Sequence, residues 1–257
     1  MLVPREPGVA PGQNLWAGEK GVKNKSGREK IKVLGIAASP RRGGNTDILL
    51  DRVLEGAASR GAEVEKVVLR GFNIEPCREC NSCQKTGQCV VEDDMQLLYS
   101  KIEEANALIL ASPIFFMSVS AYAKAFIERC QAMWARKYVL GRPLGKESTR
   151  SRRRGMFICV GATKGSRLFE GAILTMKYFF DAIDMQYHSN LLYRNVEDKG
   201  EIKDHPEALE EAFKAGQELV DFEKEPLHVS EMMSVRPTIE DTLKAQKGRQ
   251  RCTPLSA

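Results

Sequence analysis

Four of the seven cysteines lie within thirteen residues, at spacings that suit a metal or cluster site. They follow the pattern Cys77-x2-Cys80-x2-Cys83-x5-Cys89. Four thiolates are what a [4Fe–4S] cluster needs, one for each iron. Two alternatives stay open: a zinc ion, although zinc usually takes two separated cysteine pairs, and free thiols without a metal. The spacing favours the iron–sulfur cluster.

A polar loop, SPRRGGNT at residues 39–46, precedes a helical pattern and suits a phosphate. Ser39, Asn45 and Thr46 supply hydroxyl and amide donors, and the two glycines allow close backbone approach. We predict Thr46 as the helix N-cap, so that backbone N–H groups and the helix dipole face the phosphate beside one of the two arginines. Neither the Walker motif nor the dinucleotide motif is present. The alternative is a plain capped turn.

A second loop, SPIFFMS at residues 112–118, places two aromatic side chains at the carboxyl end of a predicted strand. Exposed rings at Phe115 and Phe116 suit a flat aromatic ligand, because ring stacking adds to area burial. The alternative is that both rings pack into the core or an oligomer interface. A third loop, GATKG at residues 161–165, is small enough to leave room for the edge of a ring.

Alternating strand and helix patterns must position these loops. An apolar run predicts a buried strand at residues 31–37, and further strands are expected at residues 64–69, 107–111, 156–160 and 186–193. Helical periodicity predicts helices at residues 48–57, 94–105, 120–133, 168–183 and 206–222, with a basic linker at 137–154. This alternation predicts an α/β fold with a parallel sheet, whose ligand sites lie beyond the carboxyl ends of the strands.

The chain divides into one domain and two tails. We predict a disordered tail at residues 1–30, a domain at 31–226 that carries a cysteine-rich insert at 75–94, and a second tail at 227–257, which includes a possible short helix at 238–247. The tails hold most of the formal net charge of +5, which argues against nucleic-acid binding.

The location of the protein follows from two features. The N-terminus has no apolar run like a signal-peptide core, so we expect a cytoplasmic protein. The apolar window at residues 107–126 is interrupted by Pro113 and charged by Lys124. It therefore predicts a strand, a loop and a helix instead of a membrane span.

A basic stretch contains Arg150, Arg152, Arg153 and Arg154. Its simplest interpretation is a solvated loop before a strand. The alternative is a docking surface for an acidic electron donor.

Two segments together resemble the flavodoxin-like, NADPH-dependent FMN reductases. GIAASPRRGGNT is similar to their phosphate loop and ASPIFFMSVSAYAKAFIER to their isoalloxazine loop, and the resemblance covers residues 31–222. It implies a doubly wound, five-stranded parallel sheet with helices on both faces. It also implies an FMN-binding set, with the phosphate on Ser39, Arg41, Asn45 and Thr46 and the ring beside Pro113, Ile114, Phe115, Phe116, Gly161 and Ala162.

With the four cysteines, the chain resembles the iron–sulfur flavoproteins of anaerobic microbes, whose cluster ligands have the same order and place. This implies an FMN-dependent oxidoreductase in which a [4Fe–4S] cluster relays single electrons to or from FMN, with no catalytic side chain required. It also implies a small redox donor such as ferredoxin or NAD(P)H, and a homodimer or homotetramer. Two alternatives stay open: an NAD(P)H-dependent FMN or quinone reductase without a cluster, and a non-catalytic, zinc-stabilised binding module.

Overall fold

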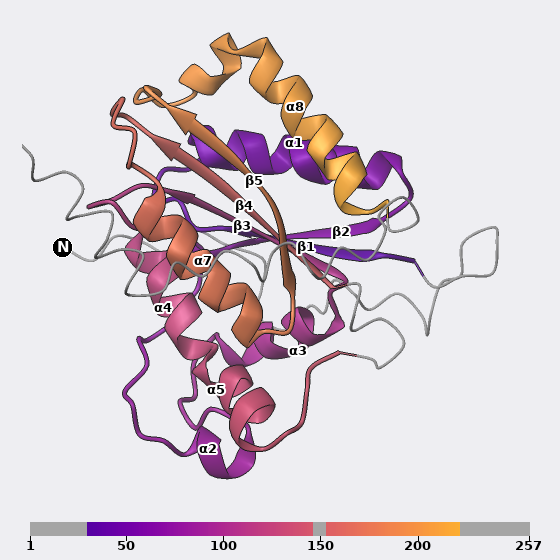
Figure 1. Ribbon diagram of the computed structural model, residues 1–257, viewed down its shortest axis with the longest axis vertical. Helices are drawn as coiled ribbons and strands as arrows, with labels where there is room; N and C mark the ends of the chain where they lie inside the picture. Colours follow the sequence, from indigo (N-terminus) through magenta and orange to yellow (C-terminus); the bar gives the residue numbers. More distant parts are fainter. Residues whose placement is uncertain (1–29, 146–152, 222–257) are drawn as a thin grey trace, which may run out of the picture. The chain divides into compact units, whose positions relative to one another are not determined.

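The computed structural model of the chain describes residues 30–145 and 153–221 (Figure 1). Five strands form one parallel sheet in the order β2-β1-β3-β4-β5. They are β1 (Lys32–Ala37), β2 (Glu63–Val68), β3 (Ala107–Pro113), β4 (Arg154–Gly161) and β5 (Gln186–Arg194). This sheet confirms the predicted α/β fold with five parallel strands.

The three central strands explain why the strand prediction succeeded. All of β4, and nearly all of β1 and β3, is buried. A parallel strand with helices on both faces reads as a continuous apolar run, which is what these segments show. The edge strands β2 and β5 are only partly buried.

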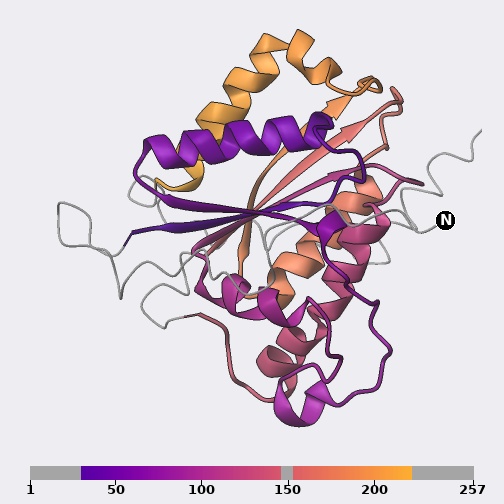
Figure 2. The ribbon, with the colours of Figure 1, turned by 180° about the vertical axis from the view of Figure 1, so that it is seen from behind.

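Helices cover both faces of the sheet (Figures 1 and 2). One face carries α1 (Asn45–Ser59) and α8 (Pro206–Leu219), and the other carries α3 (Gln96–Glu104), α4 (Ala121–Arg129) and α7 (Glu170–Ala182). Two glycines let α1 and α8 pack closely. A Cβ built on Gly56 would lie 2.0 Å from the Phe213 carbonyl oxygen, and one on Gly216 would lie 2.0 Å from that of Val53. Only glycine fits at either position.

Of the remaining short elements, α2 (Cys83–Thr86), α5 (Gln131–Trp134) and η2 (Ala135–Val139) contact one another beside the cysteine-rich segment. η1 (Leu69–Gly71) follows β2 directly, and η3 (Glu201–Asp204) precedes α8. The prediction of a single helix at 120–133 is wrong, because the helix is interrupted at Cys130, which lies between α4 and α5. The basic linker predicted at 137–154 begins instead with the π-helical turn η2.

The apolar window at 107–126 has the predicted form, with β3, a loop and the first turns of α4. In residues 30–145 and 153–221, no helix is long and apolar enough to cross a membrane. The predicted tails, and the short helix near 238–247, lie outside the described residues. The boundaries of the domain and its insert stay a prediction.

Arg153 is buried at the amino end of β4, and its guanidinium contacts the ends of two helices. It donates to the carbonyl oxygens of Ile102 and Ala105 at the end of α3, and of Ile183 at the end of α7, over 2.5, 3.2 and 2.7 Å. These carbonyls are among those that a helix leaves without internal donors, and a cation there also complements the helix dipole.

Arg154 does the same for α8, with Nη1 3.2 Å from the carbonyl oxygens of Glu218 and Leu219. The prediction of a solvated loop is therefore wrong for Arg153 and Arg154, because helix ends recruit both side chains into the protein. Arg150 and Arg152 lie outside the described residues.

Candidate functional site

Helix α1, which follows the loop after β1, begins earlier in the chain than predicted. Gly44 is the N-cap of α1, and its carbonyl oxygen accepts the Ile48 N–H over 3.1 Å. Thr46 lies in the first turn with its side chain buried, so its assignment as the N-cap is wrong. The N–H groups of that turn have no partner within the helix, and they mark the end that favours an anion.

Hydrogen bonds inside the loop fix its shape. The buried Ser39 hydroxyl accepts the Arg41 N–H over 3.1 Å. The Asp47 carboxylate accepts the Gly43 N–H over 3.1 Å and lies 3.4 Å from the Arg70 guanidinium. Ser39 and Asp47 therefore hold the loop from within.

Residues 197–200, which were not among the predicted site residues, form hydrogen bonds with the same loop. The Asn45 amide donates to the Asp198 carbonyl oxygen over 2.9 Å, and its own oxygen accepts the Gly200 N–H over 2.9 Å. The Arg41 guanidinium donates to the Glu197 carbonyl oxygen over 3.0 Å. Asn45 and Arg41, two of the four predicted phosphate ligands, thus make protein contacts that position the loop. No local sequence signal links residues so far apart in the chain.

The aromatic loop after β3 forms a tight turn with an exposed tip. Phe115 and Ser118 exchange two backbone hydrogen bonds of 2.9 Å, and Phe116 and Met117 between them have φ values of 49° and 60°. Such a turn normally takes glycine or asparagine, so two bulky residues there carry backbone strain. Phe116 is fully exposed and Phe115 is 47% exposed. The alternative of core packing is therefore wrong for Phe116.

The first turn of helix α7 packs against the aromatic turn. A Cβ built on Gly171, in the first turn of α7, would lie 2.7 Å from the Met117 carbonyl oxygen. Glycine is thus required at residue 171 for the aromatic turn to keep its place.

The loops after β1, β3 and β4 meet at the carboxyl edge of the sheet. The Ser120 hydroxyl donates to the Ala38 carbonyl oxygen over 2.6 Å, and the Ser120 N–H donates to the Ser112 hydroxyl over 2.9 Å. The Ile114 N–H donates to the Val160 carbonyl oxygen over 3.0 Å, next to Gly161 and Ala162. Ser120, which was not among the predicted site residues, is the N-cap of α4 and connects the loops after β1 and β3.

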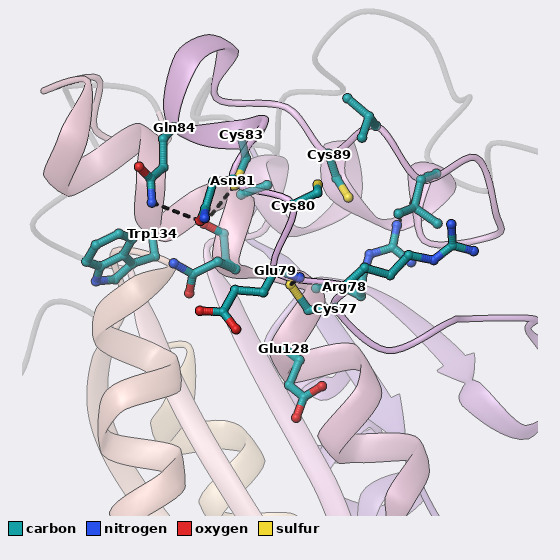
Figure 3. A pocket seen from close by; sticks show the side chains of 15 residues that line it. Cys77, Arg78, Glu79, Cys80, Asn81, Cys83, Gln84, Cys89, Glu128 and Trp134 are labelled. Carbon is teal, nitrogen blue, oxygen red and sulfur yellow. Dashed lines mark hydrogen bonds between the residues drawn. The ribbon is translucent and has the colours of Figure 1, made fainter.

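The four cysteines line one pocket of about 470 Å³ between the cysteine-rich segment and the ends of α4 and α5 (Figure 3). Cys77 and Cys80 are exposed, whereas Cys83 and Cys89 are partly buried. The Cys83 sulfur lies 4.0 Å from the Gln131 carbonyl oxygen at the start of α5. The structure therefore brings all four predicted ligands to one place.

The electrostatics of the pocket show that the sulfur atoms affect one another. Partial burial raises the pKa of the Cys83 thiol, and the charges of Cys89, Cys77 and Cys80 raise it further. Hydrogen bonds from the Ser82 backbone and side chain lower the pKa of Cys80. The Glu79 N–H lies 3.5 Å from the Cys77 sulfur. The neighbouring sulfur atoms thus make Cys83 harder to ionise, and a cationic metal core bound to all four sulfurs would offset that cost.

A single metal ion has no ready site in the described residues, because no three His, Cys, Asp or Glu side chains converge closely enough to hold one. A four-iron cube has a different requirement, since each sulfur binds a different iron and the ligands need not converge on one point. Four thiols line one pocket together with Arg129, whose buried Nε–H has no hydrogen-bond partner in the described residues, and this set of groups fits the chemistry of such a cluster.

A buried ion pair closes the cysteine-rich segment at its two ends. The Arg129 guanidinium binds the Asp93 carboxylate, the Glu75 carbonyl oxygen at 3.1 Å and the Val91 carbonyl oxygen at 3.2 Å. Asp93 in turn accepts the N–H groups of Glu75 at 2.9 Å and Met95 at 3.0 Å. No local sequence pattern reveals this pair, because Asp93 and Arg129 lie 36 positions apart in the chain.

Helix α4 connects the two sites. It begins next to Ser120, which holds the aromatic loop, and it ends at Arg129, on the wall of the cysteine pocket. At 1.5 Å per residue, its axis spans about 12 Å. The carboxyl-edge loops and the cysteine pocket are thus separate sites at opposite ends of one helix.

The strand order and the loops at its switch point between β1 and β3 define a flavodoxin-like protein. More specifically, the chain belongs to the NADPH-dependent FMN reductase family, whose sequence profile matches residues 31–190. This confirms the resemblance inferred from the sequence.

Several relatives carry the name iron-sulfur flavoprotein. One from Archaeoglobus fulgidus is 42% identical over 99 residues, which cover 38% of this chain and 45% of the relative. One from Methanocaldococcus jannaschii is 38% identical over 103 residues, covering 40% and 53%. A second from Archaeoglobus fulgidus is 36% identical over 145 residues, covering 56% and 69%. The chain thus spans about half the length of the first two.

Solved structures of other enzymes share the fold. A flavone reductase superposes with a TM-score of 0.55 and 19% identity, over 74% of this chain and 62% of its own. An NAD(P)H:quinone oxidoreductase from Methanothermobacter marburgensis superposes with a TM-score of 0.54 and 18% identity, over 74% and 99%. At these identities the likeness shows the fold alone.

Proposed function

We propose that this chain is an FMN-dependent oxidoreductase and electron-transfer protein that also holds a [4Fe–4S] cluster on Cys77, Cys80, Cys83 and Cys89. The observation that carries the proposal is the shared pocket of the four cysteines, which would serve as a second redox site besides the flavin site of the family. The names of the relatives in Archaeoglobus fulgidus and Methanocaldococcus jannaschii support it. When bound, FMN and the cluster would supply an exchange between two-electron and single-electron chemistry.

The carboxyl-edge loops would hold FMN. The first turn of α1 would receive the phosphate, beside Ser39, Arg41, Asn45 and Thr46. The exposed rings of Phe115 and Phe116 would cover the flavin ring, with Pro113, Ile114, Gly161 and Ala162 completing its surroundings. These residues bind and orient, and none of them has to move a proton.

The exposed apolar side chains support a homodimer or homotetramer. Tyr122 on α4, and Leu174 and Tyr178 on α7, join Phe116 as large apolar groups in contact with solvent. Neighbouring helices carry these groups (Figure 1), as expected of a surface that another subunit covers. We further propose a small redox donor, such as ferredoxin or NAD(P)H, and a cytoplasmic location.

Anaerobic purification of the full chain tests the proposal. We expect a visible spectrum with flavin and iron–sulfur bands, about one FMN per chain, and about four iron and four sulfide per chain. FMN without iron would instead support the alternative of a reductase without a cluster. A colourless protein that contains zinc would support the alternative of a zinc-stabilised binding module.

A further inference from the structure

Arg129 has one donor atom with no partner. Its side chain is 0% exposed, and both terminal nitrogens are engaged by Asp93 and by two backbone carbonyls. Its Nε is also buried, and within the described residues it has no hydrogen-bond partner. A buried unpaired N–H typically costs about 1–3 kcal/mol, so such an atom calls for a ligand or another explanation.

The position of Arg129 indicates what that ligand is. Arg129 is one of the residues that line the cysteine pocket, whereas Asp93 is not. Cys89 interacts electrostatically with the Arg129 guanidinium and with the Tyr99 hydroxyl, which donates to the Arg129 carbonyl oxygen over 2.9 Å. Cys89 is therefore a pocket thiol that interacts with Arg129, as does the buried Cys130 outside the pocket.

The other charges around the pocket differ from Arg129 in their exposure. Arg78 and Glu79 lie on the exposed cysteine-rich segment, and Glu128 is only partly buried. Solvent and salt screen such charges. The buried guanidinium is screened much less, so its effect on a group inside the pocket is larger than that of the rim charges.

We propose that Arg129 is a positioning residue for the cluster, whose Nε–H donates to sulfur at the Cys89 corner and whose charge stabilises the reduced form. This inference rests on the proposed function. Thiolate ligation makes a cluster anionic, and uptake of one electron adds a further negative charge. Hydrogen bonds to sulfur and nearby positive charge favour that more anionic state, so Arg129 raises the reduction potential.

The test uses the anaerobically reconstituted full chain with Arg129→Gln and Arg129→Lys. We measure iron and sulfide content, the rate of iron loss to a chelator, the EPR spectrum after dithionite reduction, and the midpoint potential of the cluster. Arg129→Gln should retain FMN, lose iron roughly 10-fold faster, and show a lower potential. Arg129→Lys keeps the charge but not the Nε donor, so its midpoint potential should lie between those of Arg129→Gln and the wild type.

Arg153→Lys is the matched control for Arg129→Lys. Arg153 is 2% exposed and also binds backbone carbonyls, yet it does not line the pocket. Its substitution should lower the melting temperature and leave the EPR spectrum, the potential and the chelator rate unchanged. If Arg129→Gln does not fold, the two lysine variants carry the comparison.

The outcomes separate the two proposals. A reconstituted wild-type protein without iron overturns the proposed function, and the inference with it. In a second outcome, the wild type holds a cluster and the Arg129 variants show the same midpoint potential, EPR spectrum and rate of iron loss to the chelator as the wild type. That result overturns the inference alone. Equal shifts in potential in Arg153→Lys would assign the effect to fold stability and overturn the inference as well.

Discussion

Arg129 and Asp93 form an ion pair that is buried from solvent, with 0% and 2% of their side chains exposed. The pair joins the end of α4 to the two ends of the cysteine-rich segment, through Glu75 and Val91. Removing one partner of a buried pair typically costs about 3–5 kcal/mol, because it leaves the other charge uncompensated.

Asp93→Asn should therefore lower the free energy of unfolding by about 3 kcal/mol, as measured by urea denaturation. Glu170→Gln is the control, because it breaks the exposed Arg167–Glu170 pair, which contributes about 0–1 kcal/mol. Equal effects of the two substitutions would contradict the structural role of the buried pair.

The same carboxylate predicts a pH dependence. Burial by itself raises the pKa of Asp93, but hydrogen bonds from Arg129 and from the N–H groups of Glu75 and Met95 outweigh it, so the pKa lies below its usual value. A depressed pKa in the folded state stabilises the fold above the unfolded pKa of about 3.9, and this stability is lost as pH falls through the folded value. The wild type should lose stability below about pH 4, and Asp93→Asn should lose less over that range. If the stabilities of the wild type and Asp93→Asn fell equally as the pH decreased, Asp93 would not be the group responsible for this pH dependence.

Cys83→Ala should remove iron from the purified protein and leave FMN bound, because the cysteine pocket and the carboxyl-edge loops lie at opposite ends of α4. Metal analysis and the flavin spectrum measure both in one sample. Cys159→Ala is the control, since that thiol lies in the core within β4. Loss of FMN together with iron in Cys83→Ala would show that the two sites are not separable.

Phe116→Gly should separate stacking from backbone strain. Glycine relieves the left-handed backbone at residue 116, so the apoprotein should become more stable by about 0.5 kcal/mol. Loss of the ring should weaken FMN binding about 3- to 10-fold, which corresponds to a stacking energy of about 0.5–1.5 kcal/mol. Met117→Gly relieves the adjacent residue and keeps the ring, so its FMN affinity should stay near that of the wild type. Fluorescence titration with FMN measures both variants, and equal affinities would argue against stacking.

Gly171→Ala should displace the aromatic turn. The added methyl group would overlap the Met117 carbonyl oxygen, which lies 2.7 Å from the Cβ position, and overpacking of this kind typically costs about 1–3 kcal/mol. Both thermal stability and FMN affinity should fall. Gly71→Ala, at a position with open space around it, should change neither. A Gly171→Ala variant with unchanged FMN affinity would show that α7 does not position the turn.

The sequence predicted those features that local patterns encode. Apolar runs located the central strands, since a parallel strand covered on both faces has few polar residues. The loops at the carboxyl edge followed from their place after those strands, and the four cysteines from their spacing.

Contacts between distant residues lay beyond the reach of such patterns. Asn45 binds Gly200 across 155 positions, and Ser120 binds Ala38 across 82. Arg153 looked like part of a solvated basic run, because nothing in the adjacent sequence reveals that the ends of α3 and α7 converge on it. The partners of these polar side chains depend on the tertiary fold, so only the structure could identify them.

Helix α4 also bears on how reactants would share the protein under the proposed function. A reactant at the aromatic turn and a reactant at the cysteine pocket approach opposite ends of a helix about 12 Å long. Two small reactants would therefore use different surfaces, and an excess of one would not displace the other by competing for the same contacts.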